Sequence, residues 1–355
     1  MGIAYPGVFV SEFGTTSFSS FESLSPTLDP STSWGIHAPD LFWRSFSQDN
    51  VILTYFGELV NRTAVGDGVM FGQQLLASEV GAALNLKSQI EVQRGTTNTM
   101  GMMLWQLGEI WPTGGWGSLE YAHSHSATKG QVAGGRWKPV HHLLEAVLFK
   151  DLLVACSAGG TCYARNDSPS QPFTGAARLT AVSVANGKSF ALGADVPLAL
   201  SVGPSAVRYF CAANGAPQGP CEAWDAVLNK VSGGLCNSSS CVLVAELYID
   251  RGAVVAANPT LLAPPHAVMP YLTPTPSVTA TLQDPPPPVG QPIALTVSVS
   301  APVLFLTLTT QAQGHFEKNS ELLTVGNSTV LFFPLPTAPS DTYSVLKNTL
   351  TLRHF

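Results

Sequence analysis

The chain has 355 residues, of which 45% are hydrophobic, so it is long enough for two or three domains with buried cores. Only 11% of the residues are charged, the net charge is -6 and there is no basic run, which argues against nucleic acid as a partner. The 32 glycines and 27 prolines predict many turns and short strands.

The first 155 residues alternate strand-like and helix-like segments. Residues 8–13 form a short apolar run that we expect to be a buried parallel strand, and residues 71–94 repeat apolar side chains with a helical period. A second buried run is expected at 100–107, and Pro139 opens a second amphipathic helix. Strand, helix, strand and helix in this order predict a parallel sheet.

From residue 156 onward, apolar residues recur at every second position, as in strands with one buried face. In 304–309 we expect the leucines to face a core and Phe305, Thr307 and Thr309 to face outward. The other strand-like segments are 161–166, 178–185, 196–202, 206–213, 241–249 and 293–299. Their spacing predicts two immunoglobulin-like β-sandwich domains, at 156–265 and 266–355.

All six cysteines lie in or beside the first predicted sandwich, and six cysteines allow 15 pairings, so the connectivity stays open. Pairs that are local in sequence, Cys211 with Cys221 and Cys236 with Cys241, are candidate disulfides that close loops. A zinc site is the competing interpretation, but the sequence has no C-x-x-C and no histidine between these cysteines, so we expect no metal.

Four N-x-S/T glycosylation motifs occur, at Asn61, Asn166, Asn237 and Asn327. Together with the cysteines they favour a lysosomal or secreted protein, and we expect its targeting signal to lie upstream, since the first residues do not resemble a secretory signal. The longest uncharged stretch, 252–283, is broken by prolines, so we expect no membrane span.

Two segments carry residues suited to chemistry. Glu12 follows a predicted strand and precedes Gly14, and carboxylates at the carboxyl ends of barrel strands point into active sites, although a glutamate on an exposed loop fits the same pattern. Trp105, Trp111 and Trp116 cluster at the end of the next predicted strand. Their rings suit stacking on sugar faces, and packing beneath a loop is the alternative.

In order along the chain, these motifs resemble glycoside hydrolase family 2, within it the β-mannosidase branch. Ser11-Glu12-Phe13-Gly14 is similar to the family's S-E-[YF]-G nucleophile motif, and Trp105-Gln106-Leu107 with Trp111 is similar to W-Q-L-N-D-x-W. Further similar segments lie at 116–121, 136–142, 162–167, 308–314 and 350–352. The resemblance thus extends over the whole chain.

The resemblance implies that residues 1–155 are the C-terminal part of a (β/α)8 TIM barrel, with strands seven and eight, ahead of the two sandwiches. It implies retaining hydrolysis of β-mannoside oligosaccharides, with Glu12 as nucleophile, the three tryptophans around the sugar and no cofactor. Retention needs a second carboxyl group about 5–5.5 Å away as acid/base. In the family this residue follows an asparagine, and no asparagine here is followed by glutamate.

We therefore expect the acid/base and six barrel strands to lie outside this chain. Three explanations are open: a truncated gene model, a C-terminal chain that associates with a separate N-terminal chain, or a degenerate product that survives on its sandwiches. The rival function is a non-catalytic carbohydrate-binding or structural protein. Exo-glucosaminidase and endo-acting mannosidase are related specificities that share the motifs.

The chain departs from the family pattern at two places. Gly108-Glu109 stands where the family has Asn-Asp, which puts the sugar contacts there in question. The insertion 122–135 carries His123 and His125, a pair that could bind a metal but that we expect to be solvated in a loop rich in serine and glycine.

Overall fold

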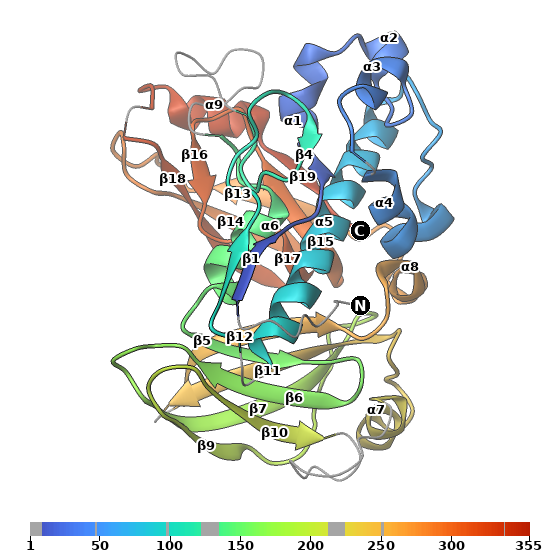
Figure 1. Ribbon diagram of the computed structural model, residues 1–355. Coiled ribbons are helices and arrows are strands. Elements are labelled where there is room, and N and C mark those ends of the chain that lie inside the picture. Colours follow the sequence, from blue (N-terminus) through green and yellow to red (C-terminus); the bar gives the residue numbers. More distant parts are fainter. Residues whose placement is uncertain are drawn as a thin grey trace. The chain divides into compact units, whose positions relative to one another are not determined.

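The computed structural model describes residues 9–46, 48–96, 99–121, 135–211, 224–249, 252–336 and 338–355, shown as a ribbon in Figure 1. The chain divides into two compact units, which are described separately. The first unit consists of Met1–Ser11, Lys87–Met103 and Leu143–Pro274. The second unit consists of Glu12–Leu86, Leu104–His142 and Thr275–Phe355.

A sheet of two strands, β1 (Phe9–Phe13) and β3 (Gly101–Leu104), stands at the start of the fold. The Phe9 ring packs on Gly101, and the Trp105 N–H donates to the Phe13 carbonyl oxygen at 2.8 Å, so the strands run in the same direction. The predicted parallel pairing is confirmed. The predicted burial is wrong, because most side chains of β1 are exposed and the sheet has no third strand among the described residues.

Both predicted helices are confirmed. Helix α5 (Gly68–Arg94) begins where the Asp67 side chain accepts the N–H groups of Val69 and Met70, which satisfies two of its unpaired donors. Pro139 opens α6 (Pro139–Leu143), which continues as the π-helical η3 (Leu144–Leu148). Short helices join β1 to α5: α1 (Phe21–Leu24), η1 (Ser25–Thr27), α2 (Pro30–Ser33), α3 (Pro39–Phe42), α4 (Gln48–Phe56) and η2 (Gly57–Leu59).

The first unit contains a β-sandwich with antiparallel strands, drawn in green to orange in Figure 1. One sheet has the order β10 (Ser205–Cys211), β6 (Thr161–Asn166), β5 (Leu152–Cys156). The other has the order β12 (Ala253–Leu261), β11 (Cys241–Ile249), β7 (Phe173–Ser183), β8 (Ser189–Ala191), with β9 (Val196–Leu200) also paired to β7. Three short helices complete it: α7 (Trp224–Ser232), α8 (Pro265–Val268) and η5 (Met269–Tyr271).

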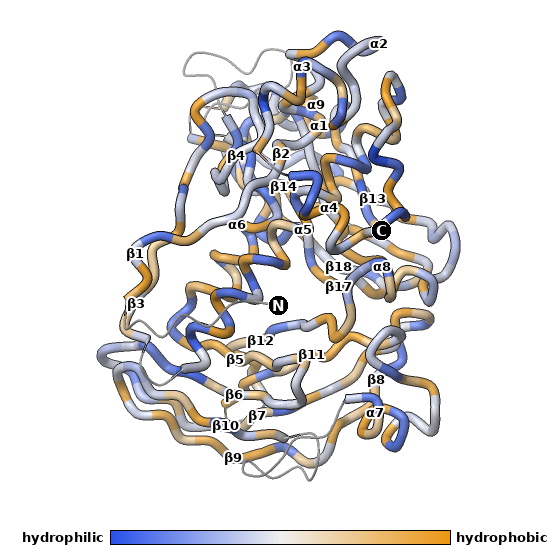
Figure 2. The backbone as a smooth tube through the Cα atoms, turned by 45° about the vertical axis from the view of Figure 1, so that its right-hand side comes forward, coloured by the Kyte–Doolittle hydropathy of each residue, from blue (hydrophilic) through white to orange (hydrophobic). Residues whose placement is uncertain are grey.

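Alternating apolar side chains of both sheets form the core of this sandwich. Leu243, Ala245 and Leu247 of β11 are buried, as period-two patterning requires. Trp224 of α7 stacks on Phe210 with ring centroids 5.6 Å apart and donates its indole N–H to the Ser157 carbonyl oxygen. In Figure 2 hydrophobic and hydrophilic colours alternate along the strands of this sandwich, as they do along α5.

The second unit contains another antiparallel sandwich, drawn in orange to red in Figure 1. One sheet has the order β13 (Val278–Leu282), β14 (Ile293–Val299), β18 (Asn327–Pro334), β16 (Gly314–Phe316). The other has the order β17 (Glu321–Thr324), β15 (Val303–Thr309), β19 (Thr351–Arg353), and α9 (Thr342–Thr349) precedes the last strand. Leu295, Phe332 and Leu346 lie at the centre of its core.

Strand β15 differs from its prediction because both of its faces are buried. Phe305 and Thr307 were expected to face outward, yet both are covered. Thr307 tolerates this environment because its hydroxyl donates to the Phe305 carbonyl oxygen at 3.0 Å and lies 2.9 Å from the Ser320 hydroxyl. An alternating pattern predicts one apolar face but does not reveal that the other face is also covered.

The described part of the chain is thus dominated by two β-sandwiches with few long helices. It contains no closed barrel, since its only parallel sheet has two strands. The domain boundaries expected at 155 and 265 stay predictions.

Candidate active site

Glu12 lies in β1, one residue before the strand ends, and its side chain is exposed. It makes no hydrogen bond or ion pair with any other described residue. A carboxylate in this position is open to an incoming molecule.

Two of the three predicted tryptophans border the end of β1. Gly14 lies so close to the Trp105 carbonyl oxygen and the Trp116 ring that any side chain at this position would collide with both. Glycine is therefore required here for close approach. The Trp105–Gln106 peptide bond is cis, and the Gln106 N–H donates to the Trp116 carbonyl oxygen at 3.2 Å.

The third tryptophan, Trp111, lies on the loop between the two segments that carry Trp105 and Trp116, and its ring is partly exposed. The loop returns through β4 (Gly114–Gly115), which pairs antiparallel with β2 (Ser17–Phe18). This pairing fixes the segment after Glu12 against the segment before Trp116.

Glu109 belongs to the Gly108-Glu109 pair that replaces the family's Asn-Asp, and its side chain does not face solvent. Its side chain is 2% exposed and forms an ion pair of 2.7 Å with Lys138, which is itself 0% exposed. Lys138 also donates to the carbonyl and hydroxyl oxygens of Ser17 at 3.2 Å, and Glu109 accepts the Gly117 N–H at 3.1 Å. Glu109 therefore holds two segments of the site together and is not available to bind a sugar.

The serine-rich loop after Glu12 is anchored by Glu120. The Ser20 N–H and hydroxyl donate to its carboxylate at 2.9 and 2.8 Å, and the Ser23 hydroxyl donates to it as well. Arg136 in turn donates to the Ser23 hydroxyl at 2.6 Å and to the Thr310 carbonyl oxygen at 2.9 Å. Our sequence reasoning did not assign these roles, because contact partners far apart in sequence leave no local pattern.

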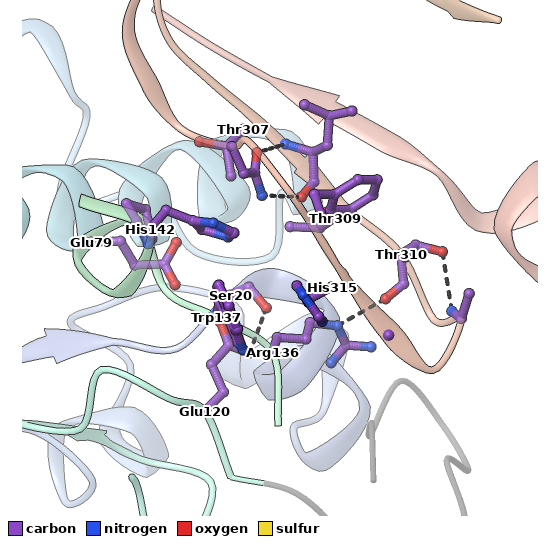
Figure 3. A pocket seen from close by; sticks show the side chains of 16 residues that line it. Ser20, Glu79, Glu120, Arg136, Trp137, His142, Thr307, Thr309, Thr310 and His315 are labelled. Atoms are coloured by element: carbon purple, nitrogen blue, oxygen red, sulfur yellow. Dashed lines mark hydrogen bonds between the residues drawn. The ribbon is translucent and has the colours of Figure 1, made fainter. Parts of the chain in front are cut away.

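Figure 3 shows that Glu79, Glu120, Arg136 and His142 surround one polar cavity in the second unit. Its volume of about 30 Å³ holds one or two water molecules, whereas small-molecule pockets measure about 300–1,000 Å³. One carboxylate oxygen of Glu79 and one guanidinium nitrogen of Arg136 have no hydrogen-bond partner within the described residues. The cavity is therefore large enough for water but too small for a hexose.

Burial controls the protonation of the groups around this cavity. Desolvation, together with the charge of Glu120, raises the pKa of Glu79 well above its usual value. Desolvation lowers the pKa of Arg136, although Glu120 and Glu22 oppose that shift. Burial, with the nearby His141 and His315, lowers the pKa of His142 to about 3, so this imidazole is neutral.

In the first unit, the segment 162–167, one of those similar to the family, has a structural role. Arg165 donates to the carbonyl oxygens of Arg94, Thr96 and Thr99, each at 2.9 Å. Asp167 pairs with Arg94 at 2.7 Å. These bonds hold the C-terminal end of α5, together with Thr96 and Thr99 beyond it.

The first unit contains disulfides between Cys156 and Cys162 and between Cys236 and Cys241, the second of which was among the candidate pairs. Cys221 and the side chain of Cys211 lie outside the described residues. Within the described ranges, no group of three or more histidine, cysteine or acidic residues is placed to hold a metal. His123 and His125 also lie outside those ranges.

The glycosylation candidates differ in accessibility. Asn61 and Asn327 are exposed, and Asn237 is partly buried. Asn166 is buried, and its amide nitrogen donates to the carbonyl oxygens of Gln171 and Ser201, so the folded chain does not present it to a glycosyltransferase. No helix in the described residues is long and apolar enough to cross a membrane.

Comparison with known proteins identifies relatives of one kind, although no protein-family model matches the chain. The β-mannosidase of Bos taurus is 31% identical over 145 residues, which cover 38% of this chain and 15% of that protein. The β-mannosidase of Rattus norvegicus is 33% identical over 78 residues, which cover 22% of this chain and 8% of that protein. These matches therefore span less than a sixth of the relatives' length.

Solved structures share the fold over nearly the whole chain. The β-D-mannosidase of Dictyoglomus thermophilum has a TM-score of 0.65 and 15% identity, covering 98% of this chain and 37% of that one. The exo-chitosanase of Amycolatopsis orientalis has a TM-score of 0.60 and 11% identity, covering 97% of this chain and 41% of that one. The resemblance inferred from the motifs is confirmed: the chain resembles the C-terminal portion of a β-mannosidase of glycoside hydrolase family 2.

Proposed function

We propose that this chain is the C-terminal part of a retaining glycoside hydrolase that releases terminal β-D-mannose from the non-reducing ends of oligosaccharides. The observation that carries the proposal is the exposed carboxylate of Glu12 at the carboxyl end of a parallel strand, directly before the Gly14 contact with Trp105 and Trp116. A carboxylate beside aromatic rings suits a nucleophile that attacks a bound sugar.

In the proposed reaction, the Glu12 carboxylate attacks the anomeric carbon and forms a covalent glycosyl-enzyme as the bond to the leaving oxygen breaks. A second carboxyl group protonates that oxygen, then takes a proton from water, which hydrolyses the intermediate and frees Glu12. The described residues give Glu12 no ion pair, so its charge is available for the attack. Trp105, Trp111 and Trp116 border the sugar with their apolar faces.

The second carboxyl group comes, in this proposal, from polypeptide that supplies the other strands of a TIM barrel, with β1 and β3 as strands seven and eight. An N-terminal chain or segment would be this partner. Such a partner would cover apolar side chains that are now exposed along and after the two strands: Phe9, Met103, Leu107 and Ile110. The sandwiches, proposed to be immunoglobulin-like, fold around cores of their own.

We further propose that the protein acts in a lysosomal or secreted setting. The disulfides Cys156–Cys162 and Cys236–Cys241 suit an oxidising compartment, and the exposed Asn61 and Asn327 could carry glycans there.

A second specificity is favoured by one observation. The exo-chitosanase fold matches this chain almost as well as the mannosidase fold, and one of its solved complexes contains a β-D-glucosamine derivative. Exo-glucosaminidase activity is therefore the candidate to test beside β-mannosidase activity.

The test is to mix the chain with an N-terminal companion that contains the Asn-Glu strand end, and to measure turnover of an aryl β-mannoside and an aryl β-glucosaminide. We expect turnover of the mannoside by the mixture and none by the chain alone. Glu12→Gln should lower the rate by at least about a thousandfold, as loss of a covalent nucleophile does. Glu58→Gln, which alters an exposed carboxylate paired with Arg62, is the matched control and should leave the rate unchanged.

A further inference from the structure

Three aromatic side chains at the end of α3 and in the segment that follows it are exposed to solvent. Phe42 is 64% exposed, Trp43 is 82% exposed and Phe46 is 47% exposed. The rings of Phe42 and Trp43 lie edge to face with centroids 6.2 Å apart. Soluble proteins rarely expose neighbouring aromatic side chains to water. Where they do, the exposed apolar surface often marks a binding site.

This aromatic segment is continuous with the candidate active site. The Phe46 ring lies 5.0 Å from the Trp116 ring, measured between centroids. Trp116 in turn borders Gly14, two residues after Glu12. The Thr16 hydroxyl also donates to the Phe46 carbonyl oxygen at 2.7 Å, which ties the segment to the loop that follows the nucleophile.

The backbone of the segment is fixed although its rings are exposed. The carbonyl oxygen of Arg44 accepts the Gly114 N–H at 2.8 Å and also the Thr113 hydroxyl. The Arg44 guanidinium donates to the Thr27 hydroxyl at 2.9 Å. A surface whose backbone is held in this way loses little conformational freedom when a ligand binds.

The rings differ in exposure: Trp116 is partly buried, Phe46 is about half exposed and Trp43 is mostly exposed. An open surface cannot enclose a terminal sugar, as an exo-acting enzyme must at its cleavage point. It can stack on the faces of sugars that continue beyond that point. The rings carry no charge, so the surface suits a neutral saccharide.

We propose that Phe42, Trp43 and Phe46 form an aromatic platform that binds the sugars on the reducing-end side of the cleaved bond. This proposal rests on the proposed function, since it takes Glu12 as the point of cleavage. The ligand is a neutral β-linked oligosaccharide of at least three hexoses, and Trp43 is the residue that selects for its length.

The test titrates the 355-residue chain with β-1,4-mannotetraose and, separately, with methyl β-mannoside, with binding followed by saturation-transfer NMR. The tetraose should bind at least about tenfold more tightly than the single sugar. Trp43→Ala should remove most of that difference and leave methyl β-mannoside binding unchanged. Trp43→Phe keeps a ring and should retain binding within about threefold. Since Trp43 is mostly exposed, neither variant should shift the unfolding midpoint.

Equal binding of the tetraose and the single sugar by the unaltered chain would refute the platform, as would a Trp43→Ala variant that binds the tetraose normally. Loss of association with the N-terminal companion in Trp43→Ala, with sugar binding intact, would show instead that the rings contact protein. The proposed function fails separately, if Glu12→Gln leaves aryl mannoside turnover intact. Tetraose binding that depends on Trp43 would then still support the platform.

Discussion

The buried ion pair between Lys138 and Glu109 gives the sharpest prediction for stability. Lys138→Met removes a charge that is 0% exposed and leaves the Glu109 carboxylate buried, with the Gly117 N–H as a remaining donor. Removing one partner of a buried ion pair costs about 3–5 kcal/mol, because the other charge stays desolvated. For a unit of this size that loss lowers the midpoint of thermal unfolding by about 6–20 °C.

The assay is thermal unfolding of the full chain, followed by circular dichroism. The matched control is Arg178→Met, which breaks an exposed ion pair with Asp195 and should leave the midpoint unchanged. The double variant Lys138→Met with Glu109→Gln removes both charges and should recover most of the loss. A Lys138→Met midpoint equal to that of Arg178→Met, or a double variant as unstable as the single one, would contradict the assignment of a buried, charged pair.

Two further predictions concern pH. His142 has a pKa of about 3 in the folded state, below its value of about 6.5 in the unfolded state. Between pH 6.5 and pH 3 only the unfolded state takes up the proton. The free energy of unfolding therefore falls by about 1.4 kcal/mol for each pH unit as the pH drops through this range. His142→Phe should flatten this part of a plot of unfolding midpoint against pH, and an unchanged slope would be inconsistent with a neutral, buried imidazole. Glu79 has a raised pKa, so its contribution is present below its unfolded value and is lost as pH rises through the folded value. Glu79→Gln should therefore gain stability relative to the unaltered chain on going from pH 4 to pH 8, and a relative loss over that range would refute the shift.

The regular elements could be predicted where the pattern is local. Strands β6 and β11 have the bounds expected from sequence, and helices α5 and α6 begin near the expected residues. Period-two and helical patterns are properties of neighbouring residues, so they can be recognised without knowledge of the fold. Burial could not be predicted in the same way. The apolar runs at β1 and β3 indicate what can be buried, and the two-stranded sheet leaves them largely open.

The residues of the candidate site also differ in whether a local sequence pattern indicates their role. Glu12 and the tryptophans could be singled out as candidates because their motifs are short, and the structure brings Trp105 and Trp116 to the end of β1. The roles of Glu109 and Glu120 were not found, because their partners Lys138 and Ser20 lie 29 and 100 residues away in sequence. In a sequence, a glutamate of a buried ion pair cannot be distinguished from an exposed glutamate, because the residue that pairs with it is not known.

The central claim, that Glu12 is the nucleophile, is tested most directly by covalent trapping. The mixture of chain and N-terminal companion is treated with a 2-deoxy-2-fluoro-β-mannosyl fluoride. This reagent forms a glycosyl-enzyme that is hydrolysed slowly, so the labelled peptide can be identified by mass spectrometry. The account predicts one mannosyl ester, on Glu12, and loss of aryl mannoside turnover in step with labelling. A label on any other carboxylate, or inactivation without a label on Glu12, would contradict it.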